Sequence, residues 1–206
     1  MIRVELAKEP DDFDEKVRKL GNAWLKANPR NNKLPNYWTA VQEEFFTAYN
    51  GYCAYTTFRY PTSDSVVVDH FKPKGSHREL AYEWSNYRLA GYHVNSKKGD
   101  SCEVLDPFQL PEDAFFLQAD GSIEPNASAF ATQELIDQAE KTIRILGLNS
   151  ESNCNARQHY IQSFLKIVSA EGVHQDIITY ATEALESTSR FLHREALRQG
   201  MIGIDE

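Results

Sequence analysis

The sequence predicts an α+β fold in which a compact unit of two strands and one helix lies between N-terminal and C-terminal helices. Apolar residues recur at helical spacing near both ends of the chain. A short β-branched run stands near the middle, and glycine-containing turn signals flank the segment that holds it. We assign residues 1–50 to an N-terminal helical segment, 51–125 to the central unit and 126–206 to a C-terminal helical region, all within one compact domain.

The N-terminal segment reads as two helices. Apolar spacing predicts the first over 11–28, which Pro29 closes, and the second over 37–49. The dipeptide Asn50-Gly51 then gives a strong turn signal.

In the central unit, the run Val66-Val67-Val68 is typical of a buried strand, which we place over 65–71. A polar loop follows, and strand character returns over 86–94. A short helix is expected to begin at Asn95 and to stop at Gly99.

The last part of the chain begins with a hairpin signal, Asp120-Gly121, between two short apolar segments. Gly147 is the expected C-cap of the helix that follows. Helices are predicted over 133–146, 154–170 and 174–199.

Composition excludes several classes of protein. With 41% hydrophobic residues the chain can bury a core, so global disorder is excluded. It has no apolar run of about eighteen residues that could span a membrane, and its acidic N-terminus lacks the apolar core of a signal peptide. Three widely spaced cysteines do not form a disulfide framework. We therefore expect a cytoplasmic protein without membrane association.

Charge is distributed unevenly along a chain whose formal net charge is -8. Residues 69–100 carry six Lys or Arg against four Asp or Glu, whereas the remainder carries 16 against 26. Nucleic-acid affinity depends on neutralising phosphates, so the one locally basic segment is where a phosphate substrate would bind. The acidic remainder predicts weak intrinsic binding, which a partner protein would have to strengthen.

Asp69 and His70 end the first predicted strand. A carboxylate is a hard oxygen ligand suited to Mg²⁺ or Mn²⁺, and histidine is a natural general base near neutral pH. Neighbouring strand residues point to opposite faces, but at a strand end the chain bends, so we expect both side chains to face one site. Taken alone, the pair is better interpreted as a polar strand end that caps a turn.

Two asparagines reverse that preference. Asn95, at the expected helix start, can offer a second oxygen ligand and free N–H groups, and Asn86 can pin the loop that holds His70. This set favours phosphodiester hydrolysis, with one divalent ion held by Asp69 and Asn95 while His70 activates water. His93 is a further candidate. The candidate phosphate contacts are Lys72, Lys74, Lys97 and Lys98.

These motifs together resemble the HNH (ββα-metal) endonuclease family, and in particular the HNH subunits of bacterial Septu-type anti-phage defence systems. The resemblance covers about residues 50–160. It rests on the strings Val68–Lys74, Trp84–Leu89, Asn95–Asp100, Leu105–Phe108 and Thr142–Asn149.

The resemblance implies a metal-dependent endonuclease that acts on nucleic acid, and an ATPase partner. Of the two nucleic acids, we expect DNA rather than RNA. In that family the residue at His70 is the general base, those at Asp69 and Asn95 bind the metal, and that at Asn86 supports the histidine loop.

Many members of the family also hold a structural zinc through two Cys pairs, which would fall at positions 53, 56, 91 and 94. Only Cys53 is a cysteine here, so a four-cysteine site is excluded and we expect no structural zinc. A site assembled from Cys53, His93 and Cys102 is the remaining zinc alternative.

Two other functions stay open. The chain could be a subunit of a defence complex that is inactive alone and is activated by an ATPase, because its C-terminal helices offer apolar faces to a partner. A metalloenzyme unrelated to nucleic acid would need only the Asp, His and Asn. The basic pairs Lys72-x-Lys74 and Lys97-Lys98 favour a phosphate substrate and so argue against such a metalloenzyme.

Overall fold

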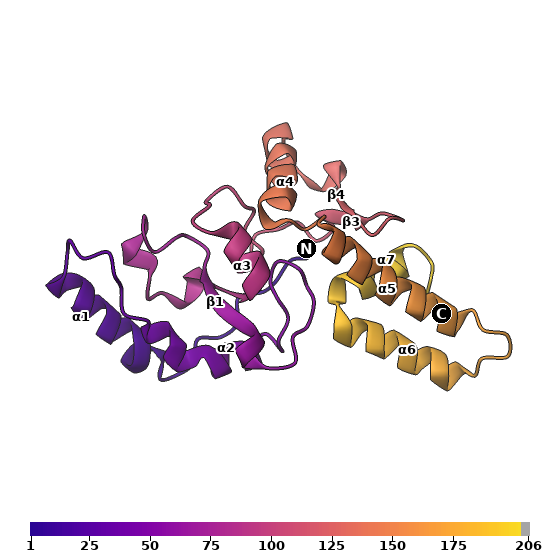
Figure 1. Cartoon of the computed structure of the whole chain (residues 1–206), viewed down its shortest axis with the longest axis horizontal. Coiled ribbons are helices and arrows are strands. Elements are labelled where there is room, and N and C mark those ends of the chain that lie inside the picture. Colours follow the sequence, from indigo (N-terminus) through magenta and orange to yellow (C-terminus); the bar gives the residue numbers. More distant parts are fainter. Residues whose placement is uncertain (203–206) are drawn as a thin grey trace.

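The fold is α+β, as the sequence predicts. A computed structural model describes residues 1–202, and within them seven α-helices accompany two antiparallel sheets of two strands each. The first sheet lies next to the N-terminal helices α1 (Lys19–Ala27) and α2 (Gln42–Ala48), and the pair α5 (Glu151–Val168) and α6 (Gln175–Thr188) lies at the other end of the molecule (Figure 1). The order of the elements therefore places the predicted catalytic segment between two helical regions.

Both N-terminal helices are confirmed. A π-helical turn at Asp14–Arg18 leads into α1 (Lys19–Ala27), and a 3-10 turn at Tyr37–Val41 leads into α2 (Gln42–Ala48). Their apolar side chains, including the fully buried Phe45, pack against one face of the central hairpin.

The central hairpin separates two apolar clusters. Strand β1 (Val66–His70) pairs antiparallel with β2 (Tyr87–Gly91), and His70 lies opposite Tyr87. Because side chains alternate along a strand, Val66 and Val68 join the cluster on the α2 side, whereas Val67 packs on the opposite side. The side on which a β1 side chain lies is therefore set by its position in the strand.

Helix α3 (Tyr92–Lys98) follows β2 directly. The prediction that the strand continues to residue 94 and that the helix begins at Asn95 is wrong. Val94 and Lys98 are the buried positions of the segment, while Tyr92 is exposed. Buried positions four residues apart lie on one face of a helix, so the burial pattern that follows Gly91 is that of a helix and not of a strand.

The second hairpin is confirmed, with β3 (Phe115–Leu117) paired to β4 (Ile123–Pro125) across the Asp120-Gly121 turn. The predicted helix at 133–146 is confirmed as α4 (Gln133–Leu146). Gly147 caps it with φ +60°, a left-handed conformation that glycine adopts without strain.

The C-terminal helices differ in their boundaries from the prediction. Helix α5 spans Glu151–Val168, and the single helix expected over 174–199 is instead α6 (Gln175–Thr188) and α7 (Arg190–Arg198). Ser189 interrupts it with an extended backbone and forms a bridge to Phe58. This break depends on a contact that is distant in sequence.

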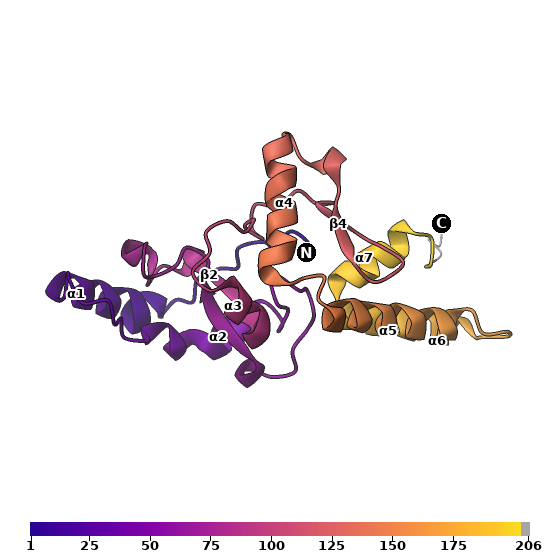
Figure 2. The ribbon, with the colours of Figure 1, turned by 45° about the horizontal axis from the view of Figure 1, so that its top comes forward.

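Figure 2 shows α5 and α6 side by side, away from the central hairpin. None of the helices within residues 1–202 is long and apolar enough to cross a membrane.

Candidate catalytic site

Asp69 lies on the side of β1 that packs against α3, and both of its carboxylate oxygens are hydrogen-bonded. The Tyr55 hydroxyl donates to Oδ2 at 2.5 Å, and Lys98 Nζ lies 3.1 Å from Oδ1. All three side chains are buried. Burial, followed by the charge of Asp69, raises the pKa of Tyr55 well above its ordinary value, so this hydroxyl remains a donor.

His70 lies against the N-terminal helices. Its Nε2 is 2.8 Å from the carbonyl oxygen of Ala81, and its ring meets those of Trp38 and Tyr87 edge to face, with centroids 4.5 and 5.1 Å away. Because a carbonyl oxygen can only accept, Nε2 carries the proton in the neutral ring. The lone pair is then on Nδ1, which has no hydrogen-bond partner within residues 1–202.

The surroundings of His70 keep its imidazole uncharged. The pKa of His70 is lowered from 6.5 to about 4, chiefly by burial; the bond to the Ala81 carbonyl acts in the opposite direction, and the charges of Lys74 and Lys98 contribute to the lowering. At neutral pH the ring is therefore an unprotonated base whose tautomer is fixed by a backbone carbonyl.

The side chains of Asp69 and His70 do not converge as the sequence led us to expect. Strand pairing continues through His70 and Tyr87, so the chain does not bend at Asp69 and the alternation of faces persists. Asp69 contacts Tyr55 and Lys98, whereas His70 contacts Trp38.

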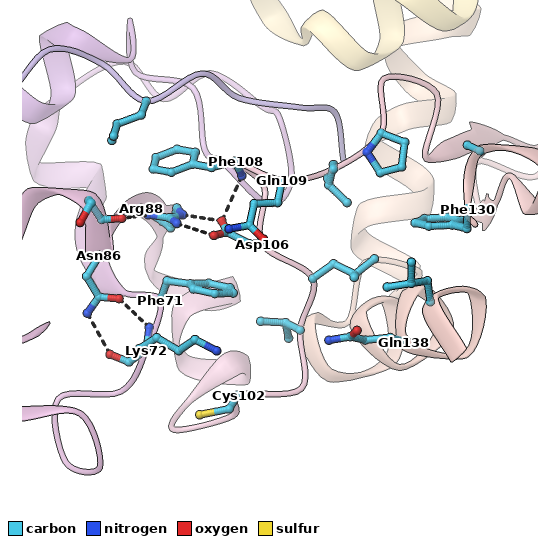
Figure 3. A pocket seen from close by; sticks show the side chains of 18 of the residues that line it. Phe71, Lys72, Asn86, Arg88, Cys102, Asp106, Phe108, Gln109, Phe130 and Gln138 are labelled. Carbon is cyan, nitrogen blue, oxygen red and sulfur yellow. Dashed lines mark hydrogen bonds and ion pairs between the residues drawn. The ribbon is translucent and has the colours of Figure 1, made fainter. Parts of the chain in front are cut away.

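Asn86 holds the loop between the strands, as Figure 3 shows for its two bonds to Lys72. Its Oδ1 accepts from Lys72 N at 2.8 Å, and its Nδ2 donates to the carbonyls of Lys72 and Leu80 at 3.0 and 3.1 Å. Ala81, the next residue, supplies the carbonyl that receives His70 Nε2. Asn86 thus fixes the segment that orients the imidazole.

Asn95 lies inside α3 rather than at its start, so the expected free N–H groups of a helix terminus do not belong to it. Its side chain is half-buried and makes no hydrogen bond within the described part of the chain. Asn95 precedes Lys98 by three residues, so the two side chains share one face of the helix.

The donor types at this face fit a hard divalent cation. Asp69 offers a carboxylate, and Asn95 offers an amide oxygen that has no hydrogen-bond partner within residues 1–202. Mg²⁺ commonly takes only one or two carboxylates because it keeps several waters. The Lys98 ammonium, however, already neutralises Asp69. Over residues 1–202 no group of three or more His, Cys, Asp or Glu stands together, so the zinc alternative of Cys53, His93 and Cys102 is not assembled.

The candidate phosphate contacts fall into two groups. Lys74 and Lys97 are exposed and Lys72 is half-buried, so these three can reach a ligand. Lys74 Nζ lies 5.0 Å from the ring of Trp38, beside His70. Lys98 differs from these three, because its side chain is 0% exposed and is paired with Asp69 in this structure.

His93, the further candidate, is exposed on α3, and the structure gives it no partner within the described residues.

A cavity of about 800 Å³ borders the histidine loop at Lys72 and Asn86. Arg88 forms a two-pronged ion pair with Asp106 there, at 2.9 and 2.7 Å, and Phe108 lies against the guanidinium with its centroid 3.4 Å away (Figure 3). This pair ties β2 to the segment that follows α3.

Three contributors to the site were missed from the sequence. Trp38 lies within the helix predicted over 37–49 and nothing in that prediction marks it, Tyr55 has no periodicity that marks it, and Ala81 acts through its backbone carbonyl. All three meet the motif through tertiary contacts, so no local signal could have identified them.

No model of a known protein family matches the sequence, and no curated protein matches it.

Proposed function

We propose that this chain is an HNH-type endonuclease that hydrolyses nucleic-acid phosphodiester bonds, with His70 as the general base. The contact between His70 Nε2 and the Ala81 carbonyl is the observation that carries the proposal. It leaves the lone pair of Nδ1 as the ring's only basic position. The succession of β1, β2 and α3 supports a ββα-metal unit around it.

In the proposed reaction, Nδ1 takes a proton from the attacking water. A base with a pKa of about 4 is weak in the free protein, but it is fully unprotonated at neutral pH. An anionic phosphate bound nearby would favour the imidazolium and so raise the pKa of His70 towards neutrality. Lys72 and Lys74 would help to hold that phosphate, and Asn86 is a positioning residue that acts through the loop.

A divalent ion, Mg²⁺ or Mn²⁺, held by Asp69 and Asn95 would supply neutralisation of the charge that develops on the phosphate. Because Asp69 and His70 lie on opposite faces of β1, this reaction requires the phosphate to bind at the end of the strand, where it would have to reach both side chains. We further propose DNA rather than RNA as the substrate and an anti-phage effector role in the bacterial cytoplasm, on the resemblance of residues 68–74, 84–89 and 95–100 to the HNH subunits of Septu-type systems.

The test is incubation of the purified chain with supercoiled plasmid and with mixed RNA, in Mg²⁺ or Mn²⁺ at low salt. His70→Gln is the test variant and His159→Gln, an exposed histidine on α5, is the matched control. We expect the wild type and the control to cleave and His70→Gln to lose cleavage. Equal cleavage by His70→Gln would refute the role of His70.

A second candidate is a partner-dependent subunit that is inactive alone and is activated by an ATPase. Exposed apolar side chains on α6 favour it, since Ile177 is 50% and Tyr180 73% exposed. The buried ion pair of Asp69 and Lys98 also favours it, because the Asp69 carboxylate is then closed to a metal ion in the isolated chain. Failure of the wild type to cleave any substrate alone, with cleavage restored by an added partner, would favour this candidate.

A further inference from the structure

We infer that Lys98 is the resident cation of the Asp69 site, and that a divalent cation enters this site only by displacing the Lys98 ammonium. The inference rests on the proposed function, because it concerns how the metal site of that nuclease is loaded.

Charge at the site is balanced before any ion binds. The carboxylate of Asp69 is 3.1 Å from Lys98 Nζ, and the side chains are 5% and 0% exposed. A buried charge without a partner is strongly unfavourable, so each member of the pair holds the other in place. The Tyr55 hydroxyl contributes a hydrogen bond to Oδ2 but no charge.

Lys98 is held by more than the carboxylate. Its Nζ also donates to the carbonyl oxygen of His70 at 3.0 Å, and it lies 6.0 Å from the ring centroid of Phe71. These contacts place the ammonium in the corner between β1 and α3. Any ion that approached Oδ1 of Asp69 would meet it there.

The ammonium and a divalent ion cannot share Asp69 at low cost. Carboxylate ligands bind Mg²⁺ at about 2.1 Å, which would bring two further positive charges close to the ammonium. Repulsion at such separations is large where water is excluded. Binding of the ion therefore requires Lys98 to leave.

The position of Lys98 in the fold allows its side chain to move towards solvent. It is the last residue of α3, and Gly99 and Asp100 after it are exposed. A lysine stem is long and flexible, so rotation of its side chain at the helix end can carry the ammonium towards solvent without unfolding the helix. Asn95, one turn earlier on the same face, has a side-chain amide without a partner among the described residues, and its oxygen can bind the incoming ion.

The test is a Mn²⁺ titration followed by the electron paramagnetic resonance signal of free Mn²⁺. The variants are Lys98→Gln, the double variant Asp69→Asn/Lys98→Gln, and Lys166→Gln, which removes a distant exposed charge from α5. We expect Lys98→Gln to bind Mn²⁺ about tenfold or more tightly than the wild type, Lys166→Gln to match the wild type, and the double variant to lose the gain. Equal or weaker binding by Lys98→Gln, or a gain that survives in the double variant, would overturn the inference.

Because Lys98→Gln leaves Asp69 buried without its partner, thermal unfolding is measured in parallel. A bound ion stabilises only the form that binds it, so Mn²⁺ should raise the Tm of Lys98→Gln more than that of the wild type. An equal or smaller rise would count against displacement. Dependence of cleavage on His70 is measured separately, so failure of the nuclease proposal and failure of this inference give different results.

Discussion

Acidification is expected to destabilise the folded chain through His70, and replacement of His70 by glutamine should remove that part of the loss. In the folded chain, burial lowers the pKa of His70 from 6.5 to about 4. An exposed histidine in the unfolded chain keeps an ordinary pKa near 6.5. Between these two values the unfolded state binds more protons than the folded state, so stability falls as the pH falls.

The magnitude follows from the same two values. They differ by about 2.5 pH units, and each unit corresponds to about 1.4 kcal/mol, which gives about 3 kcal/mol for the full effect. Above about pH 6.5, His70 is uncharged in both states and costs no stability. The loss of stability grows as the pH falls from there towards 4. Gln has no proton to gain in this range, and its amide can still donate to the Ala81 carbonyl.

The assay is urea unfolding of the wild type and of His70→Gln at a series of pH values from 7.5 to about 4.5. Other titrating groups are shared, so the difference between the two stability curves isolates His70. We expect the wild type to lose about 2 to 3 kcal/mol more than the variant across this range. Parallel curves would refute the burial assigned to His70.

Three further predictions concern the same site. Asn86→Ala should cost about 3 kcal/mol of unfolding free energy, because it leaves loop groups of the buried turn without partners, and urea unfolding that shows less than about 1 kcal/mol would contradict this. Lys98→Met should cost about 3 to 5 kcal/mol, whereas the double variant Asp69→Leu/Lys98→Met should recover much of the loss, which a double-mutant cycle measures. If the double variant is as unstable as the single one, the ion pair is not the cause. In a pH-rate profile, the acid limb of kcat/KM should lie near pH 4 rather than near 6.5, because kcat/KM reports the pKa of His70 in the free protein. An acid limb near pH 6.5 would instead show an exposed histidine.

Local signals predicted most of the secondary structure. The apolar period at 133–146 and Gly147 after it located α4, and the Asp120-Gly121 turn located the second hairpin. In both cases the signal lies within the element that it predicts or directly beside it, and tertiary contacts reinforce the local preference.

One error occurred where a distant contact overrides local preference, and another where a local pattern was misread. Ser189 breaks the last predicted helix because it bridges to Phe58, which is far away in sequence. The start of α3 was placed too late because Tyr92 and His93 were read as strand residues, although the buried positions Val94 and Lys98 are spaced as on a helix.

The candidate site was predicted in part. Order and spacing singled out Asp69, His70, Asn86 and Lys98, all of which are buried polar residues of the central unit. The sequence did not show that Lys98 faces inward. That orientation depends on how α3 packs on β1, which only the tertiary structure determines.

The most direct test of the account is the single-turnover cleavage rate of one nucleic-acid substrate by the wild type and by His70→Gln, at saturating protein and with Mn²⁺ present. A positioned general base typically contributes about 10²- to 10⁴-fold, so we expect the variant to be slower by about 100-fold or more while it remains folded. Cleavage by His70→Gln at the rate of the wild type would contradict the assignment of His70 as the base, and with it the function proposed for this site.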